Sequence, residues 1–541
     1  MPAPTARTAS TRKAFVGNND LRLLELDVSK AFVCAGALAL ACLAVPAGAQ
    51  KAKDTLRLSV DAPIQGISYY LDPKPETVFQ SEAVMDNLII FNEKDFKFEP
   101  LLAKSWKQID DVTLEFQLRD DVKWHDGQPF TADDVVSTLN WITDPKTTTI
   151  RFKGNWEFIG KVEKVGTHVV RIIAKEPTPY ALTRLAYLTT MEAAHAHGKA
   201  DDKVVYAATK PVGTGMYKVV DIDRNKGIFL ERNPEFKHGG TAKAPSNIGK
   251  IQMPFIPDAG TRIAQFLVRN IDMLRNPSLS NAEDMAKAPG VEISMGQGVG
   301  YVYMAIDAKG RSGVKPLQDI RVRKALMMAI NRKDILEALT HGRPMRTPEA
   351  LCWKFQAGCD YSVLPLAFDL AGAKKLLAEA GYGDGFALEI TTFTNETHKT
   401  AANMVANQLN QIGIKASVQP TDTGAYRKKQ GDGKIQVIVT GWPGGGNADV
   451  QGTMEFIYAV PESRDYTGDT EMIADAFKTL TIMDPEARKA AGRKVFDRSA
   501  EMAYFTPVAP SPSIVVHTSE LSATPGAFSA YQINPQDIRW K

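Results

Sequence analysis

Apolar and polar positions in the second half of the chain follow two alternating periods. Apolar residues recur at every second position in three short runs, and this spacing predicts strands at 386–390, 414–418 and 435–439. From about Thr397 to Gln411 they recur every three or four positions, which predicts an amphipathic helix, and a shorter helix is expected around Tyr426. The order strand, helix, strand, helix, strand predicts an α/β fold with an open parallel sheet covered by helices.

The same patterns predict further elements elsewhere. Alternation predicts strands at 56–60, 113–118 and 169–173. Thr131 and Asp134 have the spacing of a capping box at the start of a helix. Asp369 is expected to cap a helix that runs through Ala380 and is stopped by Gly381.

A glycine-rich segment, 441–449, follows the last predicted strand. Ligands of open α/β sheets bind beyond the carboxyl ends of the strands. The segment combines one large aromatic ring with one carboxylate, so the candidate ligand-binding residues are Trp442, Gly444, Asn447 and Asp449. The alternative is a plain turn with a tryptophan in the core.

Three tyrosines elsewhere could add aromatic walls and hydroxyl donors to a ligand site, namely Tyr69, Tyr70 and Tyr426. For each of them taken alone, packing in a core is the favoured interpretation.

The N-terminus carries one long apolar segment. Residues 31–49 are small and apolar, follow Lys30, and end in Ala47-Gly48-Ala49. This pattern is typical of a secretory signal peptide, 1–49, that is cleaved after Ala49 and leaves the mature protein in the periplasm. An uncleaved membrane anchor is the alternative.

Cysteine usage agrees with export. Cys34 and Cys42 fall inside the predicted signal, so the mature chain keeps Cys352 and Cys359. In an oxidising compartment two cysteines this close are expected to form a disulfide. A metal site is the alternative, but the spacing is wider than Cys-x-x-Cys and no histidine lies nearby.

Composition and motifs exclude several functions. The chain has 541 residues, enough for two or three domains, and a formal net charge of +3 without a long Lys/Arg block, which argues against nucleic acid as a partner. We find no esterase elbow, zinc-protease motif or phosphate loop. We therefore expect no catalytic residues, no metal and no cofactor. His195 and His197 are interpreted as a chance exposed pair, and His125 as part of a turn before the capped helix.

Several longer segments carry a family resemblance, and they follow one another in the family's order. These segments are 100–106, 114–119, 122–135, 211–218, 230–234, 319–332 and 368–382. Together they resemble the family 5 extracellular solute-binding proteins, which serve dipeptide, oligopeptide and nickel importers. The resemblance spans essentially the whole mature chain, and the segment Val122-Lys-Trp-His-Asp-Gly-Gln-Pro-Phe-Thr-Ala-Asp-Asp-Val135 is the most specific part of it.

The resemblance implies a periplasmic binding protein with two lobes and a cleft that closes by a hinge. Lobe I would comprise 50–86, 210–300 and 501–541, with an extra subdomain at 87–209, and lobe II would comprise 301–500. The implied role is the substrate-binding component of an ABC-type importer, a monomer that takes a small ligand, foremost a peptide, and delivers it to permease subunits in the inner membrane.

Two departures from the peptide binders of this family concern the ligand. They carry an aspartate shortly after the Gly-Trp pair, where this chain has Gly445, and dipeptide binders carry an arginine in the stretch that here reads 391–398 and has none. Asp449 is the nearest acid that could replace the first. A non-peptide ligand such as an opine, a sugar conjugate or another polar metabolite is therefore an alternative, and a signalling receptor or an exported hydrolase is the alternative from another class.

Overall fold

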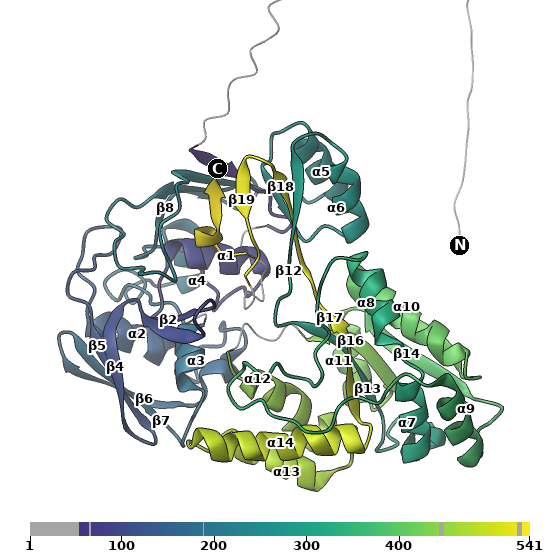
Figure 1. Cartoon of the computed structure of the whole chain (residues 1–541). Helices are drawn as coiled ribbons and strands as arrows, with labels where there is room; N and C mark the ends of the chain where they lie inside the picture. Colours follow the sequence, from purple (N-terminus) through teal and green to yellow (C-terminus); the bar gives the residue numbers. More distant parts are fainter. Residues whose placement is uncertain (1–53, 64–65, 188, 443–447, 527–532) are drawn as a thin grey trace, which may run out of the picture. The chain divides into compact units, whose positions relative to one another are not determined.

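The structure is a computed structural model that describes residues 54–63, 66–187, 189–442, 448–526 and 533–541. The predicted signal peptide lies outside these residues, as do Gly444 and Asn447. The described elements all belong to the compact unit Lys53–Lys541 (Figure 1). Among the helices of the described ranges, none is both long enough and apolar enough to span a membrane.

One sheet joins the first described strand to segments two hundred residues away. Its order is β1-β10-β9-β8, in which β1 is parallel to β10 and the other neighbours are antiparallel. The strands are β1 (Thr55–Arg57), β8 (Tyr217–Asp223), β9 (Gly227–Arg232) and β10 (Lys250–Pro254). Helix α1 (Pro75–Val84) contributes Phe79 to the same core, into which Leu56 and Tyr217 are buried. The strand predicted at 56–60 is confirmed, with its last residues forming isolated bridges.

The C-terminal segment returns to this N-terminal region. Strand β18 pairs antiparallel with β11 and β12, and β19 pairs with β20. These strands are β11 (Met273–Arg275), β12 (Val291–Gly296), β18 (Ser513–Thr518), β19 (Leu521–Ala523) and β20 (Ile538–Trp540). The helices α5 (Ala259–Leu267) and α6 (Leu279–Ala286) accompany them (Figure 1).

Residues 87–209 build an antiparallel sheet and a hairpin around their own core. The sheet order is β4-β5-β7-β6, and β2 pairs with β3. The strands are β2 (Ile89–Asn92), β3 (Lys97–Pro100), β4 (Ala103–Asp110), β5 (Thr113–Leu118), β6 (Ile159–Gly166) and β7 (Val169–Ala174), and the helices are α2 (Ala132–Thr143), α3 (Ala181–Ala186) and α4 (Lys203–Thr209). The predicted capping box is confirmed, because the Asp134 carboxylate accepts the Thr131 backbone N–H at 2.8 Å.

The strand and helix alternation predicted for the second half of the chain is confirmed. The elements are β14 (Ala387–Phe393), α10 (Glu396–Asn410), β15 (Lys415–Thr421), α11 (Thr423–Gly431) and β16 (Val437–Trp442). Strand β14 is parallel to both β15 and β16. The three predicted strands are thus parallel, as expected. The chain enters the same sheet through β13 (Tyr301–Ile306) and leaves it through β17 (Phe505–Pro510), and β13 is antiparallel to its neighbours, so the whole sheet is mixed.

Helices accompany this mixed sheet, and α13 and α14 lie side by side (Figure 1). They are α7 (Ile320–Met328), α8 (Arg332–Thr340), α9 (Leu370–Glu379), α12 (Gln451–Thr453), α13 (Thr470–Thr479) and α14 (Pro485–Glu501), and a π-helical turn, Met454–Tyr458, follows α12. The predicted cap of α9 is confirmed, since the Asp369 side chain accepts the Gly372 backbone N–H at 2.9 Å.

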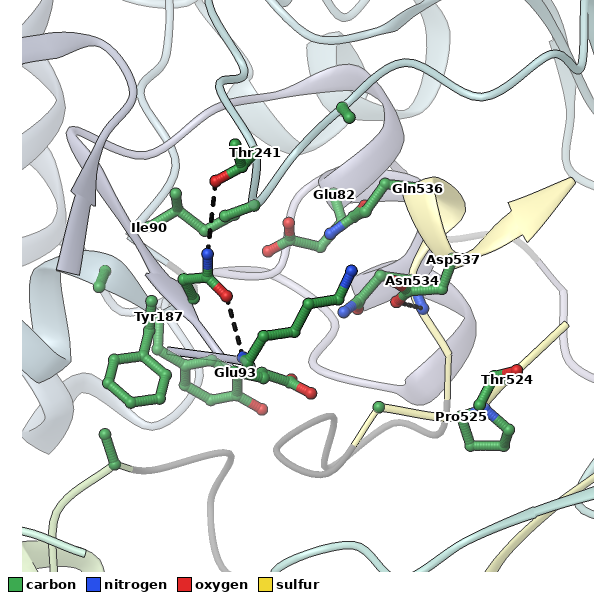
Figure 2. Close-up of a pocket in the computed structure, with 18 of the residues that line it drawn as sticks. Glu82, Ile90, Glu93, Tyr187, Thr241, Thr524, Pro525, Asn534, Gln536 and Asp537 are labelled. Atoms are coloured by element: carbon green, nitrogen blue, oxygen red, sulfur yellow. Dashed lines mark hydrogen bonds between the residues drawn. The ribbon is translucent and has the colours of Figure 1, made fainter. Parts of the chain in front are cut away.

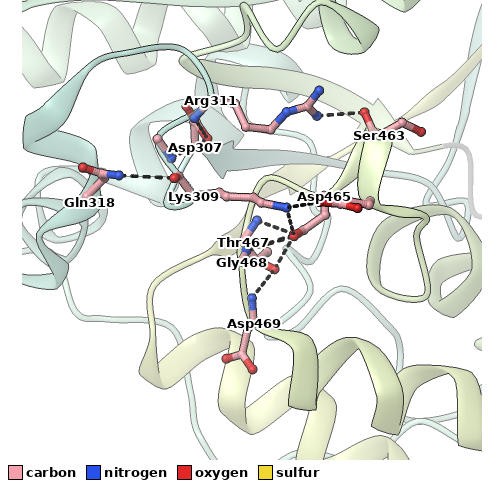
Figure 3. Close-up of polar contacts among 11 residues, drawn as sticks. Asp307, Lys309, Arg311, Gln318, Ser463, Asp465, Thr467, Gly468 and Asp469 are labelled. Atoms are coloured by element: carbon pink, nitrogen blue, oxygen red, sulfur yellow. Dashed lines mark hydrogen bonds and ion pairs between the residues drawn. The ribbon is translucent and has the colours of Figure 1, made fainter.

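Polar contacts hold the loop after β13 against the segment 465–469 (Figure 3). The Asp307 carboxylate accepts the Gly310 backbone N–H at 3.1 Å. The Asp465 carboxylate accepts the Thr467 backbone N–H at 2.7 Å and pairs with Lys309 at 3.0 Å. Both carboxylates are buried and engaged, so this cluster stabilises the loops and offers little to a ligand.

Candidate functional site

The predicted ligand loop begins inside a strand. Strand β16 ends at Trp442, and the next residue that the structure describes is Ala448. Because β14 and β16 are parallel, their carboxyl ends meet at one edge of the sheet, where ligands of such folds bind.

Trp442 lies at this edge, and its ring contacts Phe456 of the π-helical turn at a tilt of 42°. Its ring centroid is 4.9 Å from that of Phe456. Its indole N–H is buried, and among the described residues it has no hydrogen-bond partner. A buried donor of this kind is unusual, which makes the indole N–H a candidate donor to a ligand.

Asp449 is engaged within the protein. It is 3% exposed, and its two carboxylate oxygens accept from the two terminal nitrogens of Arg488, each at 2.6 Å. The carboxylate also accepts the Gln451 backbone N–H at 2.7 Å. A bidentate pair of this geometry is strong and leaves little capacity for a ligand ammonium. Asp449 therefore fixes the chain that follows the loop, and its predicted contact with ligand stays a prediction.

The predicted disulfide between Cys352 and Cys359 is confirmed, with the two Cα atoms 6.0 Å apart. The loop that it closes supports the end of the ligand segment. The Ala357 N–H donates to the Ala448 carbonyl at 2.7 Å, and the Val450 N–H donates to the Ala357 carbonyl at 3.0 Å. The disulfide loop thus holds Ala448 in place.

Tyr69 and Tyr70 are buried in the core of the 87–209 region. The Tyr70 hydroxyl donates to the Thr190 carbonyl at 2.6 Å, and its ring meets Trp156 edge-on at 5.0 Å. Tyr69 also packs edge-on against Trp156, at 6.3 Å. The structure gives both side chains packing roles and does not bring them to Trp442.

Tyr426 lines a small pocket of about 70 Å³ beside the mixed sheet. Its ring meets Phe393 edge-on at 5.1 Å, and its hydroxyl accepts from the Gln430 side-chain amide at 3.1 Å. Phe456 lines the same pocket and also contacts Trp442, so the two predicted aromatic residues lie on either side of Phe456.

A larger cavity, of about 470 Å³, is shown in Figure 2. It is bounded by α1, the β2–β3 hairpin, α3 and the C-terminal segment, and Ala448 lines it from the loop side. Its charged lining residues are Glu82, Glu93, Lys94, Asp537 and Arg539, and its apolar ones include Val78, Ile90, Phe91, Phe98 and Pro525. An apolar surface with a few charged groups of both signs is typical of a site for a small polar ligand.

A buried ion network lies directly under the cavity. Lys243 is 1% exposed and pairs with Asp86 at 2.7 Å, while His238 contacts the other oxygen of Asp86 at 2.8 Å. Burial alone would raise the pKa of Asp86, but Lys243 and His238 hold it below its usual range. Asp86 therefore balances the positive charge of Lys243.

Two carboxylates of the cavity wall are less well compensated. Glu82 lies 3.8 Å from Lys243, and burial raises its pKa despite that lysine. Burial also raises the pKa of Asp537 to about 6, against the opposing effects of the Asn534 backbone N–H and the charge of Lys94. Both carboxylates would gain from a cation placed in the cavity.

Sequence reasoning missed these cavity residues, which come from segments about 450 residues apart. One signal was present in α1, where Glu82 interrupts a helix whose other residues from Thr77 to Val84 are buried. An acidic residue in such a helix is expected to be paired or functional.

His125 and His197 both make contacts within the fold. His125 contacts the Gly215 carbonyl at 3.0 Å, and burial lowers its pKa to about 4. The interpretation of His195 and His197 as an exposed pair is wrong for His197, which is 1% exposed and packs on Trp141 at 4.3 Å. Within the described ranges, no cluster of three or more His, Cys, Asp or Glu residues could hold a metal ion.

Comparison with known proteins identifies the family. Residues 97–463 match the model of the bacterial extracellular solute-binding proteins, family 5, middle region. This match covers more than half of the chain, and the protein belongs to that family.

Individual relatives agree with this assignment. Heme-binding protein A of Haemophilus influenzae is 27% identical over 421 residues, which are 73% of this chain and 73% of that protein. The dipeptide-binding protein of Escherichia coli is 24% identical over 455 residues, which are 78% of this chain and 81% of that protein. The solved structure of the periplasmic binding protein DppA from Helicobacter pylori, in complex with the peptide STSA, matches with a TM-score of 0.71 at 22% identity, covering 90% of this chain and 98% of that one. The chain thus has the two-lobed fold of periplasmic binding proteins.

Proposed function

We propose that this protein is the periplasmic substrate-binding component of an ABC-type importer and that its ligand is a short peptide. The observation that carries the proposal is the cavity of about 470 Å³, whose wall combines carboxylates with Lys94 and Arg539. Its volume falls within the roughly 300–1,000 Å³ of small-molecule sites. A peptide presents an ammonium and a carboxylate together, and groups of both signs complement it.

On the side of the mixed sheet, we propose that Trp442 and the adjoining segment with Gly444 and Asn447 complete the wall. The position of Ala448 at the cavity supports this, since it directly follows that segment. The disulfide loop supports it further by fixing Ala448.

The same proposal includes the lobes inferred from sequence, 50–86, 210–300 and 501–541 against 301–500, with 87–209 as the extra subdomain. Contacts between residues of these regions already occur, such as the ion pair between Arg184 and Glu455 at 2.6 Å. A ligand held between the lobes favours the closed state only through contacts that the open state lacks. The closed complex would dock on the permease, and the protein itself would perform no chemistry on its ligand.

A second candidate ligand is a polar, amine-bearing metabolite that is not a peptide. The sequence favours it at two positions, because Gly445 stands where peptide binders carry an aspartate and the stretch 391–398 contains no arginine.

The test is a thermal-shift screen of the mature protein with pools of dipeptides to pentapeptides, followed by titration calorimetry of each pool that shifts the midpoint. We expect saturable binding of one ligand per chain. If polar non-peptide metabolites raise the midpoint and every peptide pool leaves it unchanged, the peptide assignment is wrong. Fractionation of the source cells tests the location, with the processed chain expected in the periplasmic fraction.

A further inference from the structure

We infer that this protein selects ligands with a free primary amine and that Glu82, Asp537 and Gln536 bind this amine. The inference rests on the proposed function and names the chemical group that the cavity recognises. It places the amine site on α1 and the C-terminal segment.

The first observation is the placement of the three side chains. Glu82 comes from α1, while Gln536 and Asp537 belong to the short 3-10 turn Pro535–Asp537 before β20. All three line the cavity, and Figure 2 shows them on one side of it. Each side chain supplies an oxygen acceptor, and a primary ammonium has three N–H donors to match them.

The second observation is the charge balance. Lys243 is engaged by Asp86 at 2.7 Å and lies farther from Glu82, at 3.8 Å. The Asp537 carboxylate accepts the Asn534 backbone N–H at 3.3 Å, and within the described ranges it forms no ion pair. The charges of Lys94 and Arg539 also act on Asp537, but neither forms an ion pair with it among the described residues. Two half-buried carboxylates without a close cation of their own favour a cationic group beside them.

The third observation is independent of charge. The side-chain oxygen of Gln536 is buried, and among the described residues it has no hydrogen-bond donor. A buried acceptor without a donor costs free energy that a ligand N–H would recover. Lys94 and Arg539, which also line the cavity, remain available for the ligand's carboxylate.

The consequence is a rule about ligands. Peptides and other small molecules with a free amine bind, and their N-acylated forms do not, because acylation removes the positive charge and two of the three donors. An amine bound at this site would not require the aspartate that peptide binders of the family carry at the position of Gly445.

The experiment compares one lysine-free pool of tripeptides and tetrapeptides before and after acetylation of its amines, by competition titration against the wild-type mature protein. We expect acetylation to weaken binding at least 100-fold. Glu82→Gln and Asp537→Asn should each weaken binding of the free-amine pool at least tenfold. The matched control is Asp95→Asn, which removes an exposed negative charge from the nearby β2–β3 turn and should leave affinity within twofold.

The possible outcomes separate the two proposals. Equal binding of the free and acetylated pools, or unchanged affinity in both cavity variants, overturns the amine site while leaving a peptide-binding protein. If neither pool binds, the peptide function itself fails. Urea denaturation of each variant shows that it is folded, and we expect both to fold because each substitution removes a buried charge.

Discussion

Two aspartates show how differently the protein treats a carboxylate. Asp449, at the end of the predicted loop, is 3% exposed and paired in bidentate fashion with Arg488. Asp537, on the C-terminal side, lines the cavity, and burial raises its pKa to about 6. A carboxylate whose cation is built into the fold serves stability, whereas one that is desolvated without such a cation is free to serve a ligand.

The surroundings of the two aspartates differ as well. Around Asp449, the Arg488 side chain also donates to the Thr479 carbonyl at 2.9 Å, and the disulfide loop bonds to the chain on both sides of Asp449. These contacts fix the chain on both sides of Asp449.

The largest expected effect comes from breaking the buried ion pair between Asp449 and Arg488. Asp449→Asn should destabilise the protein by about 3–5 kcal/mol, because it leaves the Arg488 charge buried without a partner. Urea denaturation monitored by tryptophan fluorescence measures this. In the double variant Asp449→Asn/Arg488→Met, part of the loss should be recovered, and a loss below about 1 kcal/mol in the single variant would show that the pair is dispensable.

Removing the disulfide tests the support of the same wall. Cys352→Ser/Cys359→Ser should cost roughly 2–3 kcal/mol, the loop-entropy value for a short loop, at a sequence separation of 7. Gly358, inside this loop, adopts φ +79, a backbone conformation that glycine adopts without steric cost. The measurement is a denaturation curve with and without reductant, in which the wild type should respond and the variant should not.

Asp537→Asn should have the opposite sign from Asp449→Asn. The folded protein keeps a proton on Asp537 up to about pH 6, above the ordinary value of 3.8, so ionisation of this group lowers stability as pH rises from about 4 to about 6. Without ligand, the variant should be more stable than the wild type at pH 8 by roughly 1–2 kcal/mol.

At pH 4 the stability difference between Asp537→Asn and the wild type should nearly vanish, because the wild-type carboxyl is then protonated. Thermal unfolding across pH 4–8 gives both values. A variant less stable than the wild type at pH 8 would assign Asp537 a structural role like that of Asp449.

The smallest expected effect concerns Trp442. Trp442→Ala should weaken ligand binding about fivefold by removing an aromatic wall, with little change in the free energy of unfolding. Trp442→Phe keeps a ring and removes only the indole N–H, and it separates stacking from hydrogen bonding. Titration with a peptide pool that binds the wild type is the readout, and unchanged affinity in both variants would place the ligand away from this edge.

The fold was predictable where local signals agree with the tertiary structure. The alternation around β14, α10 and β15, the Asp369 cap and the Cys352–Cys359 pair needed only short-range patterns. Strands β13 and β17 were not predicted, because the pairing of β13 with β16 and of β17 with β13 joins segments far apart in the sequence.

Only one side of the candidate ligand site was predictable from the sequence. The edge with Trp442 follows from a general rule about parallel strands. The cavity wall joins Glu82 to Asp537 across 455 positions of sequence, and nothing local to either residue indicates the other. Asp449 is the acid nearest to Gly445 in the sequence, and its pairing with Arg488, 39 residues later, is not indicated by any local pattern.

The most direct test of the amine site is native mass spectrometry of the protein purified under gentle conditions from its source cells. We expect a bound adduct of small-peptide mass that reacts with an amine-specific reagent once it is released. An adduct without a primary amine would contradict the assignment of Glu82 and Asp537 as the groups that receive the ligand.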